Sequence, residues 1–160
     1  MTQPVEIHLD IETDWHRRLT VIGFESRETG LIQMVGSEIS SGRLLRELPS
    51  SGRLFTYNGH CFDIVRIRKE LRVDLAHHFE SCDLRWLCQR NGLVGGQKAI
   101  EKRLGFERSG EELDGRDAIR LWEKARSGDE KSLQRLLEYN ASDVRGIEAI
   151  KLHLRSKGLV

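Results

Sequence analysis

The spacing of apolar residues changes once along the chain, and that change limits what the chain can fold into. Over Val5–Ile11 apolar and polar residues alternate strictly, which predicts a strand. From about Phe62 the apolar residues recur at helical spacing, first at Ile64, Ile67 and Leu71. Strands at the start, followed by helices interleaved with further strands, predict an α/β fold with a mixed sheet.

The remaining elements follow from the same two patterns. Further strands are expected over Leu19–Phe24 and Leu31–Val35, at Leu54, Phe55 and Tyr57, and over His78–Cys82. Helices are expected over Ser40–Leu48, Asp83–Arg90, Gln97–Leu104, Arg116–Arg126 and Glu130–Arg155, with Asp83 and Asp129 as caps. Because the first three strands are closely spaced, we expect an antiparallel meander. No repeat or linker is visible, so residues 1–160 are expected to form a single domain.

The net charge alone does not predict strong, non-specific electrostatic binding to nucleic acid. The chain has 26 basic and 25 acidic side chains, which leaves a formal charge of +1. A nucleic-acid contact would therefore need a local basic patch, or metal ions that invert the charge of an acidic site. The N-terminal stretch does not resemble a signal peptide, and no apolar run is long enough to cross a bilayer. We expect a cytoplasmic protein without a membrane partner.

The cysteines do not predict a zinc site. Cys61, Cys82 and Cys88 are an odd number without paired short spacing, and His77 and His78 do not complete a recognised ligand pattern. We interpret the three cysteines as small buried apolar residues in a reducing compartment.

Two carboxylates on the first strand are the first candidate site residues. Asp10 and Glu12 are two positions apart, so their side chains point to the same face of the strand. Burying two carboxylates is costly without a partner, and a divalent cation is a natural one because hard cations prefer oxygen ligands. The alternative is that Glu12 ends the strand in solvent.

Two later segments add further candidates. Asp63 follows the turn after the fourth predicted strand and falls at a helix start, where it could also act as a simple N-cap. Tyr139 and Asp143 are four positions apart on the last predicted helix, so they share one face. Tyr139 could instead be a core aromatic residue with a solvated hydroxyl.

Together these residues form a specific order of motifs. D-x-E on the first strand, N-G-x-x-F-D after the fourth and Y-x-x-x-D on the last helix resemble the three motifs of the DEDDy 3′–5′ exonucleases. These enzymes belong to the RNase H-like superfamily, which includes polymerase proofreading domains. The stretch from Cys82 to Gly105, with Gly95-Gly96-Gln97-Lys98 and Glu101, is similar to the narrower YprB-like bacterial RNase H-like domains.

The resemblance implies an RNase H-like mixed five-stranded sheet flanked by helices, and a metal-dependent 3′–5′ exonuclease acting on DNA or RNA. It implies two divalent ions, Mg²⁺ or Mn²⁺, held by the family's four acids, which here are Asp10, Glu12, Asp63 and Asp143. It implies that Tyr139 orients the attacking water. The related subtype has a histidine five positions before the last aspartate, where this chain has Glu138. A single-stranded 3′ end is the expected substrate.

Other residues have two readings each. Asn58 could bind the terminal nucleotide or stabilise its turn, and Lys98 could support a phosphate at a helix N-terminus after Gly95–Gly96 or be solvated. His60 and Trp15 could contact the substrate, or be a surface imidazole and an edge-packed ring. A basic helix face is most simply solvated; it consists of Arg66, Arg68, Lys69 and Arg72.

Four competing functions remain open at this point. The same fold could be a non-catalytic nucleic-acid-binding module, an interaction domain with structural acids, or a structure-specific endonuclease. A haloacid-dehalogenase phosphatase also begins with an acidic strand, but it needs an aspartate where this chain has Glu12. The sequence does not decide between DNA and RNA, and it does not indicate an oligomeric state.

Overall fold

The first strand lies at the centre of a mixed five-stranded sheet. The computed structural model describes residues 4–108, 110 and 112–160. The sheet has the order β3-β2-β1-β4-β5, with β1 antiparallel to β2, β2 antiparallel to β3, and β1, β4 and β5 parallel. The strands are β1 (Glu6–Thr13), β2 (Leu19–Ser26), β3 (Gly30–Val35), β4 (Arg53–Thr56) and β5 (Glu80–Asp83). The mixed sheet and the antiparallel meander are both confirmed.

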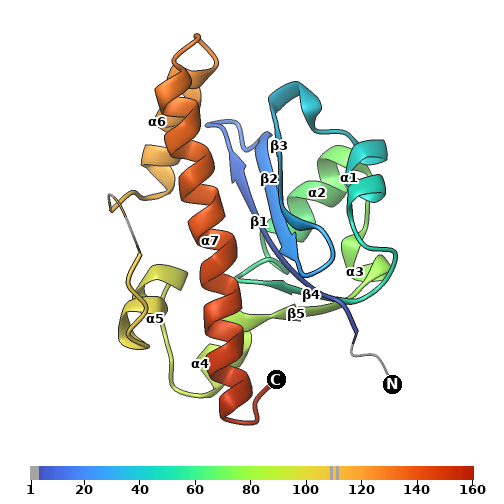
Figure 1. Ribbon diagram of the computed structural model, residues 1–160, viewed down its shortest axis with the longest axis vertical. Coiled ribbons are helices and arrows are strands. Elements are labelled where there is room, and N and C mark those ends of the chain that lie inside the picture. Colours follow the sequence, from blue (N-terminus) through green and yellow to red (C-terminus); the bar gives the residue numbers. More distant parts are fainter. Residues whose placement is uncertain (1–3, 109, 111) are drawn as a thin grey trace.

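Helices cover both faces of the sheet (Figure 1). The long helix α7 runs across one face, where α4, α5 and α6 pack beside it. The opposite face is covered by α1, α2 and α3, which share one apolar core with β1 and β2. The bounds are η1 (a 3₁₀ helix, Gly36–Glu38), α1 (Ser41–Glu47), α2 (Asp63–Leu71), α3 (Leu75–His78), α4 (Leu84–Arg90), α5 (Gln97–Arg103), α6 (Gly115–Ala125) and α7 (Glu130–Ser156).

The strict alternation of β1 sorts its side chains between these two layers. Its apolar residues Ile7, Leu9 and Ile11 are buried in the core under α2. The side chains in between are polar, and two of them are bonded to residues of α7: His8 to Lys151 and Asp10 to Asn140. The sheet therefore presents a polar row from its central strand to one long helix.

Two predictions about local structure need correction. The last strand begins at Glu80 rather than His78, because His78 ends the short helix α3, which the sequence pattern did not predict. Asp74 caps α3 through a bond from Ala76 N to its carboxylate. Of the three cysteines expected to be buried, Cys88 is buried, Cys82 is half-buried and Cys61 is exposed. The predicted caps Asp83 and Asp129 are confirmed, since each side chain accepts from backbone N–H groups of the first turn.

None of the helices in the described part of the chain is both long enough and apolar enough to cross a membrane.

Candidate metal centre

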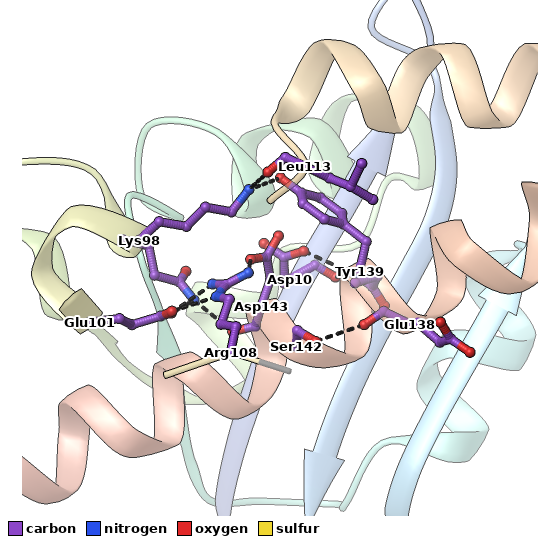
Figure 2. Close-up of polar contacts among 11 residues, drawn as sticks. Asp10, Lys98, Glu101, Arg108, Leu113, Glu138, Tyr139, Ser142 and Asp143 are labelled. Atoms are coloured by element: carbon purple, nitrogen blue, oxygen red, sulfur yellow. Dashed lines mark hydrogen bonds and ion pairs between the residues drawn. The ribbon is translucent and has the colours of Figure 1, made fainter. Parts of the chain in front are cut away.

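Three carboxylates gather where β1 faces α7. Asp10 and Glu12 extend from β1, and Asp143 extends from the middle of α7. One ligand oxygen from each of the three lies within 4.8 Å of the others. Figure 2 shows Asp10 and Asp143 pointing toward one another. The pattern D-x-E on one strand and the helical aspartate, far apart in sequence, thus meet at a single point.

Glu12 is drawn into this cluster rather than released to solvent. Its residue is 8% exposed, and the strand continues beyond it to Thr13, so the alternative in which Glu12 ends the strand in solvent is wrong. Its Oε1 is buried and has no hydrogen-bond partner within the described part of the chain. A buried carboxylate oxygen without a donor is costly, and a bound cation would satisfy it.

Repulsion between the buried carboxylates also favours a bound cation. Burial raises the pKa of Asp10 and of Glu12 well above the usual range, and the neighbouring carboxylate of Asp143 raises both further. Burial also raises the pKa of Asp143, although the Arg108 guanidinium partly opposes that rise. Like charges held this closely disfavour their own ionisation unless positive charge is supplied.

Asp63 lies beside the cluster but does not belong to its compact group. It is the first residue of α2, Phe62 is the N-cap, and no side-chain bond caps this helix, so the interpretation of Asp63 as an N-cap is wrong. Its Oδ1 instead accepts a hydrogen bond of 3.1 Å from Ile11 N on β1. Burial raises the pKa of Asp63 to about 7, with smaller contributions from Asp83 and Asp143.

Asn140 fixes the orientation of Asp10, and the sequence pattern did not reveal it. This fully buried amide donates from Nδ2 to Asp10 Oδ2 at 2.9 Å and accepts from Gln33 Nε2 at 2.9 Å. The amide lies over Gly23 of β2, where a Cβ atom would overlap Asn140 Oδ1. Any larger side chain at position 23 would therefore have to displace the Asn140 amide. Asn140 adjoins Tyr139 in the motif, but nothing in its spacing distinguishes it from a solvated asparagine.

Tyr139 and Lys98 form a pair at the edge of the cluster. The Lys98 ammonium donates to Tyr139 Oη at 2.9 Å, lies 4.2 Å from the centroid of its ring, and also donates to the Leu113 carbonyl (Figure 2). Burial, together with the carboxylates of Asp143 and Glu12, raises the pKa of Tyr139, so its hydroxyl stays protonated. Lys98 is therefore not a solvated lysine. Tyr139 is partly buried, and its hydroxyl accepts a hydrogen bond from Lys98 instead of being only solvated.

Arg108, Glu101 and Gln97 complete the polar network, and Arg108 was not predicted at all. Arg108 donates to both carboxylate oxygens of Glu101 and to Asp143 Oδ1, the last at 2.5 Å. Gln97 Nε2 donates to Glu101 and to the Asp143 carbonyl. Gln97 and Glu101 lie within the stretch that resembles the YprB-like domains. Arg108 lies outside every motif, in the segment between α5 and α6.

The less certain candidates have mixed outcomes. Asn58 has a left-handed backbone with φ of +66°, and its N–H donates to Asp83, so it stabilises the turn before α2. His60 is not a surface imidazole, because its ring bonds Ser81 at 2.7 Å and packs edge-on against Trp86. Trp15 is 55% exposed. Substrate contacts of Asn58, Lys98, His60 and Trp15 stay predictions.

The predicted basic helix face is largely solvated. Arg68, Lys69 and Arg72 are exposed, while Arg66 donates to the carbonyl of Arg17. This agrees with the simplest reading of the pattern.

Comparisons with known proteins place the chain in a family. The chain is similar to the family B DNA polymerase of the hyperthermophilic archaeon Pyrobaculum calidifontis, with a TM-score of 0.74 and 13% identity over 96% of this chain and 25% of that chain. A structure described as the apo form of a nuclease gives a TM-score of 0.57 and 16% identity, over 99% of this chain and 76% of that chain. At these identities the likeness concerns the fold alone.

The chain spans a quarter of the length of the polymerase that it matches. No curated protein sequence matches it. A family model of the RNase H superfamily, by contrast, matches residues 7–155, which include every residue of the candidate metal centre. The expected RNase H-like fold is confirmed, and the chain belongs to the RNase H superfamily.

Proposed function

We propose that this protein is a metal-dependent 3′–5′ exonuclease that hydrolyses phosphodiester bonds of DNA or RNA. The observation that carries the proposal is the convergence of Asp10, Glu12 and Asp143, with ligand oxygens within 4.8 Å, one helical turn from the hydroxyl-bearing Tyr139. Oxygen-only ligands at a site that retains access to solvent suit hard divalent cations. The order of the motifs supports the DEDDy type within the superfamily.

The residues present fit Mg²⁺ or Mn²⁺. Glu12 Oε1 is buried without a donor, and the carboxylates raise one another's pKa values, so the cluster lacks positive charge. Asp10, Glu12 and Asp143 would hold two ions, with Asp63 joining from α2. Bound ions would supply an activated water and stabilise the leaving oxygen of the phosphodiester.

The surrounding residues orient the reacting groups. Asn140 donates to one oxygen of Asp10 and so fixes the orientation of that carboxylate in the site. Lys98 donates to Tyr139 Oη, which leaves the phenolic proton available to a water molecule. Because its pKa is raised, Tyr139 acts by hydrogen bonding and not as a base. Lys98 thus has a positioning role in addition to its predicted contact with a substrate phosphate.

One assay tests the proposal directly. Purified protein is incubated with 5′-labelled single-stranded DNA and RNA oligonucleotides in Mg²⁺, Mn²⁺ or EDTA. We expect a ladder that shortens from the 3′ end, appears only with a divalent metal, and is absent in D10N. A 3′-blocked oligonucleotide provides the control. Cleavage of the blocked substrate at internal positions would identify an endonuclease instead, and binding without cleavage in any metal would leave a non-catalytic module.

A further inference from the structure

Arg108 places a positive charge directly on one of the clustered carboxylates. Its Nη1 donates to Asp143 Oδ1 at 2.5 Å, and its side chain is 23% exposed. Figure 2 shows the guanidinium between Glu101 on one side and Asp143 on the other. Arg108 is thus partly open to solvent and lies next to the candidate metal centre.

The guanidinium is anchored independently of Asp143. Its Nε and Nη2 donate to Glu101 at 2.5 and 2.7 Å, in the paired geometry that matches a carboxylate. Glu101 is 2% exposed and accepts a further bond from Gln97. Beneath it, α7 carries Gly146, where a Cβ atom would overlap the Glu101 carboxylate. The Glu101 carboxylate is thus buried against the α7 backbone and needs a cationic partner, which Arg108 provides.

Occupation of the site by a divalent cation and the contact between Arg108 and Asp143 oppose each other. A cation held by Asp10, Glu12 and Asp143 would bring two positive charges next to the guanidinium, and like charges at this range repel. Glu101 would still hold the Nε and Nη2 groups of Arg108. Nη1, which contacts Asp143, would be the group released.

We propose that Arg108 is a phosphate-binding residue of this site. Without metal its Nη1 neutralises Asp143; with metal bound, Nη1 donates to a non-bridging phosphate oxygen at the 3′ end of the substrate. Arginine suits this role because a carboxylate can hold one side of the fork while the remaining N–H groups bind a phosphate. The proposal rests on the proposed function, since it takes a nucleic-acid phosphate as the ligand.

Isothermal titration calorimetry tests both halves of the proposal without relying on turnover. Mn²⁺ is titrated into wild type, R108A and the control R103A, which removes the same charge from an exposed position in the last turn of α5. Thymidine and uridine 5′-monophosphate are then titrated into the Mn²⁺-loaded proteins. In R108A we expect Mn²⁺ to bind several-fold more tightly and both mononucleotides about tenfold more weakly, the usual effect of losing a charge-assisted bond to phosphate. R103A should resemble wild type in both titrations.

R108A leaves the buried Glu101 carboxylate without its cationic partner and could fail to fold. A second pair of variants therefore removes the charge of Glu101 as well. E101Q/R108A is compared with E101Q, so that only the arginine differs. Equal Mn²⁺ affinity within either pair, or mononucleotide affinities within twofold, would overturn the proposal and leave Arg108 as a tie for its segment. Oligonucleotide hydrolysis by wild type is measured in parallel. If wild type cleaves and R108A keeps its KM, Arg108 has no substrate role although the proposed function stands. If wild type cleaves nothing, the proposed function fails by itself.

Discussion

Asn140 bonds the Asp10 carboxylate and occupies the space left by the missing side chain of Gly23 on the neighbouring strand. Its amide bonds Asp10 and Gln33, and it fits only because Gly23 has no side chain. The register places Asp10, Gly23 and Gln33 side by side across three strands. The orientation of Asp10 therefore depends on a glycine that has no polar atoms of its own in the site.

Gly23→Ala should weaken the site through this contact. The added methyl group displaces Asn140, which overpacks the contact between sheet and α7 and costs roughly 1–3 kcal/mol of unfolding free energy. Chemical denaturation measures this loss, and Mn²⁺ titration should show weaker binding because Asp10 is no longer held. Gly42→Ala is the matched control, since a Cβ there meets nothing within 4 Å. Equal stability of the two variants would mean that Asn140 moves aside freely.

Tyr139→Phe should lower the rate of hydrolysis and leave metal binding nearly intact. The ring keeps its packing, and only the hydroxyl that bonds Lys98 is lost. A rate loss of about tenfold to a thousandfold is expected for a group that positions the nucleophile. Rates at saturating Mn²⁺ provide the measurement, with Asp143→Asn as the contrast that should weaken metal binding instead. Full rescue of Tyr139→Phe by excess Mn²⁺ would show that Tyr139 acts through the metal.

Residue spacing predicted only part of this site. Periodicity placed Asp10 and Glu12 on one strand face, and Tyr139 and Asp143 on one helix face. That the two pairs belong to one site was implied only by the resemblance to a known family, and the structure brings Asp10, Glu12 and Asp143 together. Arg108 could not be found this way, because it reaches Asp143 from an irregular segment and across 35 positions of sequence. Contacts made by irregular segments depend on the tertiary packing that positions them, and local periodicity does not contain that information.

At the scale of elements, a buried ion cluster fastens the C-terminal half of α7 to β1. Lys151 is 2% exposed, and its ammonium contacts Glu6 at 2.7 Å and His8 at 3.0 Å. Arg155, one turn further along α7, also pairs with Glu6. Loss of the acid and loss of the buried base should lower the free energy of unfolding by different amounts. Only the loss of Glu6 leaves the buried Lys151 ammonium without a counter-ion.

Glu6→Gln should destabilise the protein more than Lys151→Met. The first change leaves the Lys151 ammonium buried without its carboxylate, which costs about 3–5 kcal/mol in comparable cases. The second removes the buried charge and fills its volume, while Glu6 keeps Arg155 as a partner. Urea denaturation of both variants gives the comparison. A larger loss for Lys151→Met would show that the lysine contributes mainly by packing, including its position 5.5 Å from the ring centroid of Phe55.

The same cluster predicts sensitivity to acid. Although partial burial opposes it, bonding to Arg155 and Lys151 lowers the pKa of Glu6 to about 2, from 4.5. A carboxylate whose folded pKa is depressed stabilises the fold above its unfolded pKa and loses that contribution as pH falls toward the folded value. We therefore expect stability to decline from pH 4.5 to pH 2 by about 1 kcal/mol from this group, after allowance for solvent screening. Denaturation midpoints across this range should fall less steeply in an E6Q/K151M double variant.

Element boundaries show where periodicity stops being informative. The predicted end of α7 lies only one residue before the observed end. This helix was easy to predict because its apolar residues recur along most of its length. The helix α3, by contrast, has four residues, too few to display a helical period, and one of them was assigned to the following strand. Short elements are defined by their caps and by the tertiary contacts around them.

For the whole molecule, the order of elements determined the fold more firmly than any single residue did. In the structure, the meander places β2 on one side of β1 and the later strands β4 and β5 join in parallel on the other side, so β1 is the central strand and helices cover both faces of the sheet (Figure 1). The polar face of β1 then lies against α7, so the acids from both ends of the chain meet. The strand order itself did not follow from the pattern, because β4 and β5 join the sheet by long crossovers.

Divalent metal should stabilise the whole fold, because it binds the folded arrangement and not the unfolded chain. The Tm of wild type should rise with millimolar Mn²⁺ and rise much less in Asp10→Asn, which removes a central ligand. Without metal, Asp10→Asn should be at least as stable as wild type, since it relieves repulsion that raises the neighbouring pKa values. Asp129→Asn, an exposed cap at the start of α7 where asparagine caps equally well, is the control.

Asp63→Asn decides how far the site extends. The amide oxygen of asparagine can still accept from Ile11 N, so the link between α2 and β1 should persist. If Asp63 joins the metal site, its variant should show a Tm rise between those of Asp10→Asn and wild type, measured in the same Mn²⁺ series. A rise identical to that of wild type would restrict the site to Asp10, Glu12 and Asp143, whose oxygens already lie within 4.8 Å. Asp63 would then serve to hold the start of α2 against the central strand, and the number of metal ions that three carboxylates can hold would need to be measured anew.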